Sequence, residues 1–409
     1  MQEKNASQVL NNLLFWYMSA ITLLLTLIPF RFVIPDEHIK VALWSNLQDA
    51  LMNIALFIPL GFLFQLTRRE KRNDWAFGAL VFGLLFSSGI EITQLFIEKR
   101  CTTFLDVLTN GAGAWLGALG YAIVRRFFAG RQAANYRILA IDLPLMNIIY
   151  LMIPLMWINS MAIGRQQQRL WLIFLLGISG AIILGEIYRR EIRKREPLLM
   201  LAFACAAMLW FAIGSMFSVA ERTREILLMT TFVGCITLVT AMRQPLRQSA
   251  NFRYEIATLR LILIFFVPYL LLVFFSPLAI PEAKWDFVFG ISGIPNKPPN
   301  VSIFRLLEYL AGFSLLGYML SQIVARYETS LFWKKFNLAV LIFWIPGILE
   351  IVRGFHPQYE TSALGYAFAI AAGFAGSLIY RLQLGSIRRI LIHRSQNLSE
   401  SPTPEQSIP

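Results

Sequence analysis

Charged side chains are scarce in this chain of 409 residues. Asp, Glu, Lys and Arg make up 15% of it, whereas a soluble domain carries about a quarter. Hydrophobic residues make up 57%, and the mean hydropathy is +0.58. Long apolar runs recur along the chain, far more than one globular core could bury. These features exclude an ordinary soluble enzyme and predict an all-α polytopic membrane protein.

Cysteine and histidine are also rare. The three cysteines do not make a disulfide framework. Cys205 and Cys235 fall inside apolar runs, where a small buried residue is the default expectation, and Cys101 is expected near a surface. His356 lacks the ligand spacing of a metal site. We therefore predict neither a metal nor a cofactor.

Twelve apolar runs are suited to span a membrane, and they leave room for little beyond short loops. The first run is too long for the core of a signal peptide and is followed by further spans, so we interpret it as a retained membrane helix. The predicted spans lie at about residues 13–33, 50–66, 75–97, 107–124, 138–163, 170–188, 198–219, 226–242, 259–280, 303–324, 337–352 and 362–381.

Lysine and arginine are enriched in alternate loops. If the N-terminus lies in the cytoplasm, 25 of the 37 Lys and Arg residues fall in cytoplasmic segments. Because positive residues favour that side, we predict that both termini are cytoplasmic. The net charge of +13 is then explained by topology signals and contact with anionic lipid headgroups, rather than by binding of nucleic acid.

Two distant parts of the chain are alike. The stretch "NIALFIPLGF" at 53–62 matches "YLAGFSLLGY" at 309–318 at a shift of 256 residues, and "IEI" at 90–92 matches "LEI" at 349–351 with three residues inserted. Spans 1–4 and 9–12 are therefore interpreted as two copies of one four-helix unit. An even number of spans separates equivalent helices, so the copies share one orientation.

This repeat divides the chain into four expected parts. In the fourth helix, the shift of 256 places Gly117 on Gly373 and Gly120 on Gly376. The parts are a four-helix unit at 1–125, a middle region of four helices at 126–258, a degenerate four-helix repeat at 259–385 and a disordered cytoplasmic tail at 386–409.

Polar side chains gather at one depth in the first unit, just under the outer headgroup zone. Residues three or four apart share a helix face. A carboxylate near the bilayer centre costs about 2.5–3.5 kcal/mol, so these groups must face partners or water, or take up a proton. The set is Asp49 and Asn53 in the second span, Glu91 and Gln94 in the third, Arg100 in the loop, and Asp106 and Asn110 in the fourth.

Small residues suggest how these spans approach one another. Gly113 and Gly117 form a small-xxx-small face, and Pro59 and Gly61 loosen the second span. We expect a tight four-helix cup that opens to the extracytoplasmic side. The alternative is that its polar residues only join helices, at about 1 kcal/mol for each contact.

Two acids outside this set have simpler interpretations. Glu186 has Arg189 and Arg190 close by near the inner end of the sixth span. Glu308 stands three positions after Arg305 in the tenth. Both are expected to form structural ion pairs along their own helices.

The motifs of the first unit resemble the VanZ-like family of bacterial membrane proteins, named after a teicoplanin-resistance protein. The resemblance covers about residues 13–125, with a degenerate second copy at about 259–381, and it departs from the family at Thr103, where members often carry an acid. It implies a place in the cell envelope and a link to glycopeptide tolerance. The matching residues are Asn53 before "LFIPLGF", Ile90-Glu91 with Gln94, Arg100, and Asp106 before Asn110 and Gly113.

Three functions remain open. The first is an envelope enzyme or binding protein for lipid-linked phosphate or sugar headgroups, located in the bacterial cytoplasmic membrane. The second is a lipid or solute transporter. The third is a non-catalytic membrane protein that alters glycopeptide access. In the first, Glu91 and Asp106 are the candidate catalytic residues, and Arg100, Asn53, Gln94 and Asn110 are candidates for substrate binding.

The partners expected are membrane lipids or lipid-linked envelope precursors. The second unit keeps Glu350 and its packing glycines but loses the other polar residues, so it is predicted to serve packing. At the shifts above, Tyr309 stands at Asn53, Arg353 at Gln94, Ser362 at Asp106 and Tyr366 at Asn110.

Overall fold

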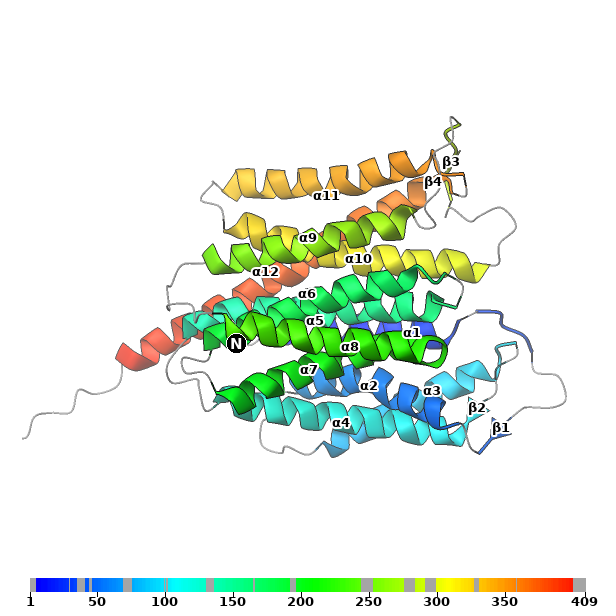
Figure 1. Cartoon of the computed structure of the whole chain (residues 1–409), viewed down its shortest axis with the longest axis horizontal. Helices are drawn as coiled ribbons and strands as arrows, with labels where there is room; N and C mark the ends of the chain where they lie inside the picture. The colour runs from blue at the N-terminus through cyan, green and yellow to red at the C-terminus, as the bar shows by residue number, and fades with distance from the viewer. Residues whose placement is uncertain are drawn as a thin grey trace, which may run out of the picture.

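In the part of the chain that the computed structural model describes, twelve α-helices lie side by side in one bundle (Figure 1). The structure describes residues 5–28, 30–34, 41–43, 46–68, 76–98, 100, 102–129, 136–164, 166–191, 196–243, 253–275, 284–290, 299–326, 331–357 and 359–399. The helices are α1 (Asn5–Thr26), α2 (Leu47–Thr67), α3 (Phe77–Gln94), α4 (Phe104–Ala129), α5 (Tyr136–Ala162), α6 (Arg169–Glu191), α7 (Pro197–Ser215), α8 (Val219–Met242), α9 (Arg253–Phe275), α10 (Pro299–Ala325), α11 (Leu331–Arg353) and α12 (Ala363–Ser399).

The all-α membrane fold predicted from composition is confirmed, and each predicted span overlaps one helix. Within the described residues, eleven helical stretches are long and apolar enough to cross a membrane. One of them, Pro197–Met242, holds both α7 and α8. These two helices are joined by the 3₁₀ turn η1 (Met216–Ser218) and pack against each other, so they form a hairpin rather than one long span.

Helix ends differ from the predictions where polar residues continue a helix. The first span was expected at 13–33, but α1 runs from Asn5 to Thr26. Polar turns satisfy their backbone hydrogen bonds as well as apolar ones do, and the chain before Pro29 disfavours helix. The tail expected to be disordered from residue 386 is helical to Ser399, because no Gly or Pro stands between Gly385 and Pro402. Residues 400–409 lie outside the described residues.

Two short parallel strand pairs lie at the same end of the bundle (Figure 1). Strand β1 (Val41–Ala42) pairs with β2 (Thr102–Thr103), and β3 (Phe287–Val288) pairs with β4 (Thr361–Ser362). Each pair joins the segment after α1 or α9 to the segment before α4 or α12. The sequence did not predict them, because a two-residue strand has no readable period. Their common end gives α1–α4 and α9–α12 the same direction.

Backbone contact between helices fixes the site helices against each other. A Cβ at Gly61 of α2 would overlap the carbonyl group of Ala114 in α4, and a Cβ at Gly117 would overlap that of Ile58. Gly113 meets α2 in the same way, so the predicted small-residue face of α4 is confirmed. This close packing holds α2 and α4 in one register.

The equivalent contacts in α10 and α12 correct the predicted alignment of the repeat. Gly317 meets the carbonyl group of Gly373, and Gly376 meets that of Ser314. Gly376 therefore stands at the position of Gly117, 259 residues later, and the pairing of Gly117 with Gly373 was wrong. The three residues inserted in the second unit lie between Gly317 and Glu350. No later deletion compensates for them, so the shift stays at 259 residues through α12.

The corrected shift also changes the counterparts of the polar residues in α4. The counterpart of Asp106 is Gly365 rather than Ser362, and that of Asn110 is Ala369 rather than Tyr366. Ser362 is the counterpart of Thr103.

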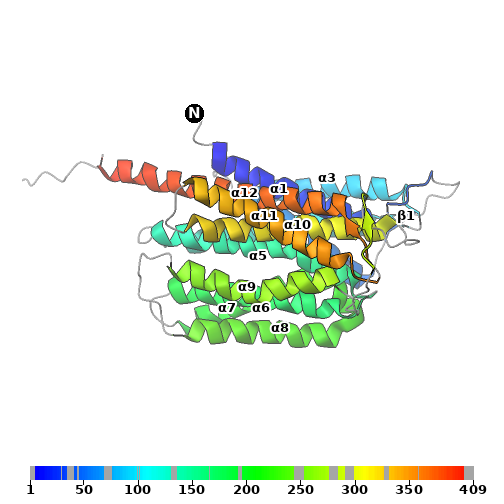
Figure 2. The ribbon, with the colours of Figure 1, turned by 90° about the horizontal axis from the view of Figure 1, so that it is seen from above.

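Helices α5 and α10 have the largest buried share of their spans. Figure 2 shows α6–α9 on one side of these two helices and α1, α3 and α12 on the other. Outside this centre, Cys205 and Cys235 are exposed. Their expected burial was wrong, because helix faces that meet lipid are as apolar as those that meet protein. Cys101 lies outside the described residues.

Candidate functional site

Glu91 is held at the strand-bearing end of the bundle. It lies three residues before the end of α3 and is only 5% exposed. Its carboxylate Oε2 accepts a hydrogen bond from the backbone N–H of Thr103 at 3.2 Å, and its carbonyl oxygen accepts one from the hydroxyl of Thr102 at 3.1 Å. Strand β2 therefore fixes Glu91 against the start of α4.

Asp106 and Asn110 bring α4 to the same place. Asp106 lies in the first turn of α4, close enough to Glu91 for their charges to interact. The side-chain amide of Asn110 donates to the hydroxyl of Ser87 at 2.7 Å. Ser87 lies four residues before Glu91, on the same face of α3. The predicted cluster of Glu91, Asp106 and Asn110 is thus present in the structure.

Several oxygen atoms of this cluster have no partner within the described part of the chain. They are Oγ1 of Thr103, Oδ1 of Asp106 and Oδ1 of Asn110, and all three atoms are buried. Buried polar atoms are nearly always hydrogen-bonded in folded proteins, because leaving one unpaired costs about 1–3 kcal/mol. The cluster therefore offers three acceptors to donors such as water or the hydroxyl groups of a ligand.

Gln94 and Arg100 lie beside this cluster and bind the end of α1. The side-chain amide of buried Gln94 donates to the carbonyl group of Thr26 at 2.9 Å, and the guanidinium of Arg100 donates to that of Ile28 at 2.8 Å. Carbonyl groups at a helix C-terminus lack intrahelical partners, so these two side chains complete α1. Gln94 therefore anchors a helix in this structure.

Arg100 has a second neighbour in Glu91. The Arg100 residue is exposed, and its charge interacts with that of Glu91. Among the residues that the structure describes, it forms no ion pair with Glu91 or Asp106. Arg100 thus remains at the rim of the cluster, where an anion could reach it.

Asn53 lies on α2, which packs against α4. It is half-buried and precedes Ile54, whose carbonyl group touches Gly113 of α4. Its counterpart in the second half of the chain is Tyr309, and the hydroxyl of Tyr309 donates to Glu350, the counterpart of Glu91. The matching geometry of the two halves therefore places Asn53 on the side of α2 that faces Glu91.

Sequence reasoning missed Ser87, Thr102 and Thr103 as parts of the cluster. Helical spacing from Glu91 would have revealed Ser87, whereas the two threonines are placed only by the strand pair.

The second half of the chain repeats the framework of this site and adds protein partners to its carboxylate. Oε2 of Glu350 accepts from the backbone N–H of Ser362 at 3.1 Å, and its carbonyl oxygen accepts from the hydroxyl of Thr361 at 2.9 Å. In addition, Tyr309 donates to Oε1 of Glu350, and Arg353 donates to the Tyr309 hydroxyl. Arg353 also lies 3.6 Å from Glu350 and is 1% exposed. This ion pair runs along α11, and the hydroxyl of Tyr309 stands between its two side chains.

Tyr309 also occupies the space of a missing acid. A Cβ at Gly365, the counterpart of Asp106, would press against the Tyr309 ring. The tyrosine at the position of Asn53 therefore takes the space beside the glycine at the position of Asp106. A pocket of about 470 Å³ remains next to it, lined by Glu350, Thr361 and Ser362 among others.

The other two acids differ in outcome. Glu186 pairs with Arg189 at 2.7 Å as predicted. Glu308 pairs with Arg169 of α6, and Arg305 lies 4.2 Å over the ring of Tyr359. Glu308 was predicted to pair with Arg305 along α10, but the ion pair that it forms is with Arg169 of the neighbouring helix.

The described residues contain no group of three or more His, Cys, Asp and Glu side chains that could hold a metal. The helical bundle and its apolar spans define the class: an all-α, multi-pass membrane protein. Residues 3–125 match the family model described as VanZ/LLP1. The N-terminal unit is therefore VanZ-like, which confirms the resemblance seen in its motifs. No curated protein and no solved structure matches the chain.

Proposed function

We propose that the cluster of Glu91, Asp106 and Asn110 binds the phosphate or sugar headgroup of a lipid-linked molecule of the bacterial cell envelope. The observation that carries this proposal is the set of three buried oxygen atoms without partners. Sugar hydroxyls are donors that match such acceptors. Water alone would satisfy them too, so the test must measure a ligand.

Charge completes the match to a lipid-linked phosphate. Arg100 stands exposed at the rim, and a guanidinium pairs well with phosphate oxygens. Glu91 and Asp106 lie where they could move a proton at a bound hydroxyl group. The proposed catalytic pair is therefore Glu91 and Asp106, with Arg100, Asn53 and Asn110 binding the headgroup and Gln94 supporting α1.

The site lies at one membrane surface rather than at mid-depth. Glu91 is in the last turn of α3 and Asp106 in the first turn of α4. Transport sites lie near the bilayer midplane, so this position favours headgroup chemistry over transport. The distribution of Lys and Arg supports an extracytoplasmic site, with both termini in the cytoplasm of a bacterial cell.

The proposed division of the chain follows from the same geometry. We assign the site to a unit at 1–125, a packing role to the repeat at 259–385, and a connecting role to the four helices at 126–258. The helix that continues beyond residue 385 belongs to the cytoplasmic side.

The experiment combines binding with a cellular lipid profile. Purified protein is titrated with a long-chain polyprenyl phosphate, with and without an attached sugar. We expect Glu91→Gln and Asn110→Leu to weaken binding at least tenfold and to alter the headgroup-lipid profile of cells, normalised to membrane protein level. Glu350→Gln is the matched control, and it should affect abundance alone.

The outcomes separate the alternatives. Binding with no change in the lipid profile would indicate a non-catalytic protein that shields or presents envelope lipids. If Glu350→Gln abolished the cellular phenotype at normal abundance and Glu91→Gln left it intact, the working site would lie in the second half of the chain.

A further inference from the structure

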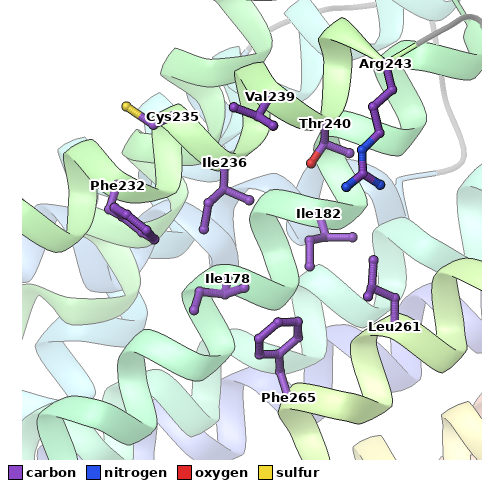
Figure 3. Close-up of a pocket in the computed structure, with 10 residues that line it drawn as sticks. All are labelled: Ile178, Ile182, Phe232, Cys235, Ile236, Val239, Thr240, Arg243, Leu261 and Phe265. Atoms are coloured by element: carbon purple, nitrogen blue, oxygen red, sulfur yellow. The ribbon is translucent and has the colours of Figure 1, made fainter.

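A cleft outside the polar site lies between α6, α8 and α9 (Figure 3). Its volume is about 350 Å³. Ile178 and Ile182 of α6 line it on one side, with Val239 of α8 and Leu261 and Phe265 of α9 around it. Nearly all of the lining is apolar. A volume at the low end of the range for ligand pockets suits a single hydrocarbon chain better than a folded ligand.

The cleft opens on the outer flank of the bundle. Val239 is 61% exposed, and Cys235, which also lines the cleft, is exposed. Both belong to a stretch apolar enough to cross a membrane. At this depth the surroundings of the flank are hydrocarbon, so the occupant must be hydrocarbon too.

One end of the cleft is polar and basic. Arg243 directly follows the spanning stretch that ends at Met242, and its guanidinium turns back toward the cleft (Figure 3). The Arg243 side chain is exposed, and its guanidinium has no hydrogen-bond or ion-pair partner among the described residues. The hydroxyl of Thr240 points into the cleft beside it (Figure 3). On α9, exposed Arg260 precedes Leu261.

Helix packing explains why the cleft stays open. Helix α6 packs against both α8 and α9. Gly185 of α6 lets Thr240 approach closely, so α8 meets α6 near the basic end. Ile178 then stays half-buried between α8 and α9, and the buried side chain of Ile182 also lines the groove. A guanidinium at the mouth of such a groove complements a phosphate group.

We propose that this cleft holds an acyl chain of an anionic phospholipid from the leaflet on the Arg243 side, with the lipid phosphate against Arg243. This gives the middle helices a lipid-binding role that is independent of the polar site in α2–α4. The apolar groove selects for a chain, and the arginine selects for the anionic headgroup.

The test uses the full-length protein in detergent with equal amounts of phosphatidylglycerol and phosphatidylcholine, and native mass spectrometry counts the bound lipids. We expect preferential retention of phosphatidylglycerol. Arg243→Gln should reduce that preference about tenfold, because a hydrogen bond to a charged group is lost. Val239→Trp should fill the mouth and reduce retention of both lipids.

Matched controls keep the test independent of folding. Arg126→Gln removes another exposed arginine that ends a spanning helix, and Leu228→Trp adds a tryptophan at an exposed site of α8 away from the cleft. Neither control should change lipid retention. Equal retention of both lipids by the native protein, or equal effects in controls and test variants, would overturn the proposal. A dimer mass without lipid would instead assign the cleft to a second copy of the chain.

Discussion

Glu91 and Glu350 are held by the same hydrogen bonds in opposite halves of the chain, yet their surroundings differ. Both accept from a backbone N–H at the start of the following helix, at 3.2 and 3.1 Å. Around Glu91, buried acceptors remain without partners in the described residues. Around Glu350, Tyr309 binds the carboxylate and Arg353 binds Tyr309, while Nε and Nη2 of Arg353 are the atoms without partners in the described residues. Substitutions on the surrounding helices thus decide whether the carboxylate of one framework has protein side chains as partners.

The comparison separates packing from chemistry. The glycine contacts between α2 and α4 recur between α10 and α12, so the framework does not depend on the polar residues. In the second half, a buried charge pair takes the place of the open acceptors. Such a pair adds little stability over an apolar core, but removal of one partner is costly.

The largest effect is expected from breaking the buried ion pair between Arg353 and Glu350. Arg353→Leu leaves Glu350 buried with its charge unmatched, and should cost about 3–5 kcal/mol of unfolding free energy. Arg100→Leu, in the first half, removes an exposed side chain and its hydrogen bond to Ile28, and should cost about 1–2 kcal/mol. Chemical unfolding of the purified proteins measures both. Equal losses of unfolding free energy would mean that Arg100 stabilises the first half as much as Arg353 stabilises the second.

A second effect concerns the helix contacts shared by both halves. Gly61→Ala and Gly317→Ala each place a methyl group on a carbonyl group of the facing helix, and should cost about 1–3 kcal/mol. Gly89→Ala and Gly120→Ala meet no other atom within 4 Å. These two should stabilise their helices by up to about 1 kcal/mol. Thermal unfolding that showed the same sign for both pairs would contradict the backbone contact.

The third prediction gives the first site the tyrosine and the glycine that the second site has at equivalent positions. Asn53→Tyr alone should overpack the first site and cost about 1–3 kcal/mol. Addition of Asp106→Gly provides the space that Gly365 leaves for Tyr309, so the double variant should recover most of that loss. A double-mutant cycle measures the coupling. The double variant should also lose headgroup binding, and retained binding would show that the unpartnered oxygens are not the ligand site.

The smallest perturbation tests the common direction of the halves. In a background without native cysteines, Glu98→Cys and Lys284→Cys place thiols at exposed positions near the two strand pairs. An impermeant maleimide should label both from outside intact cells. Arg126→Cys, at the other end of the bundle, should react only after the membrane is opened. Labelling of Glu98→Cys but not of Lys284→Cys would show that the two halves cross the membrane in opposite directions.

Sequence alone determined the class of protein, the helices that the structure describes and the grouping of three polar residues in the first unit. Apolar runs mark spans because each helix satisfies its own backbone in lipid, whatever its neighbours are. Motif spacing brought Glu91, Asp106 and Asn110 to one level, since helix geometry is local.

Only tertiary structure decided which groups are satisfied. Hydrogen bonds from Gln94 and Arg100 to the end of α1, and from Thr103 to Glu91, join segments that no local pattern connects. Backbone contact at Gly376 set the true register of α12, and the ring of Tyr309 filled the space beside Gly365. Whether a polar group is open or paired depends on atoms supplied by other helices, and their distances are fixed only when the bundle has packed.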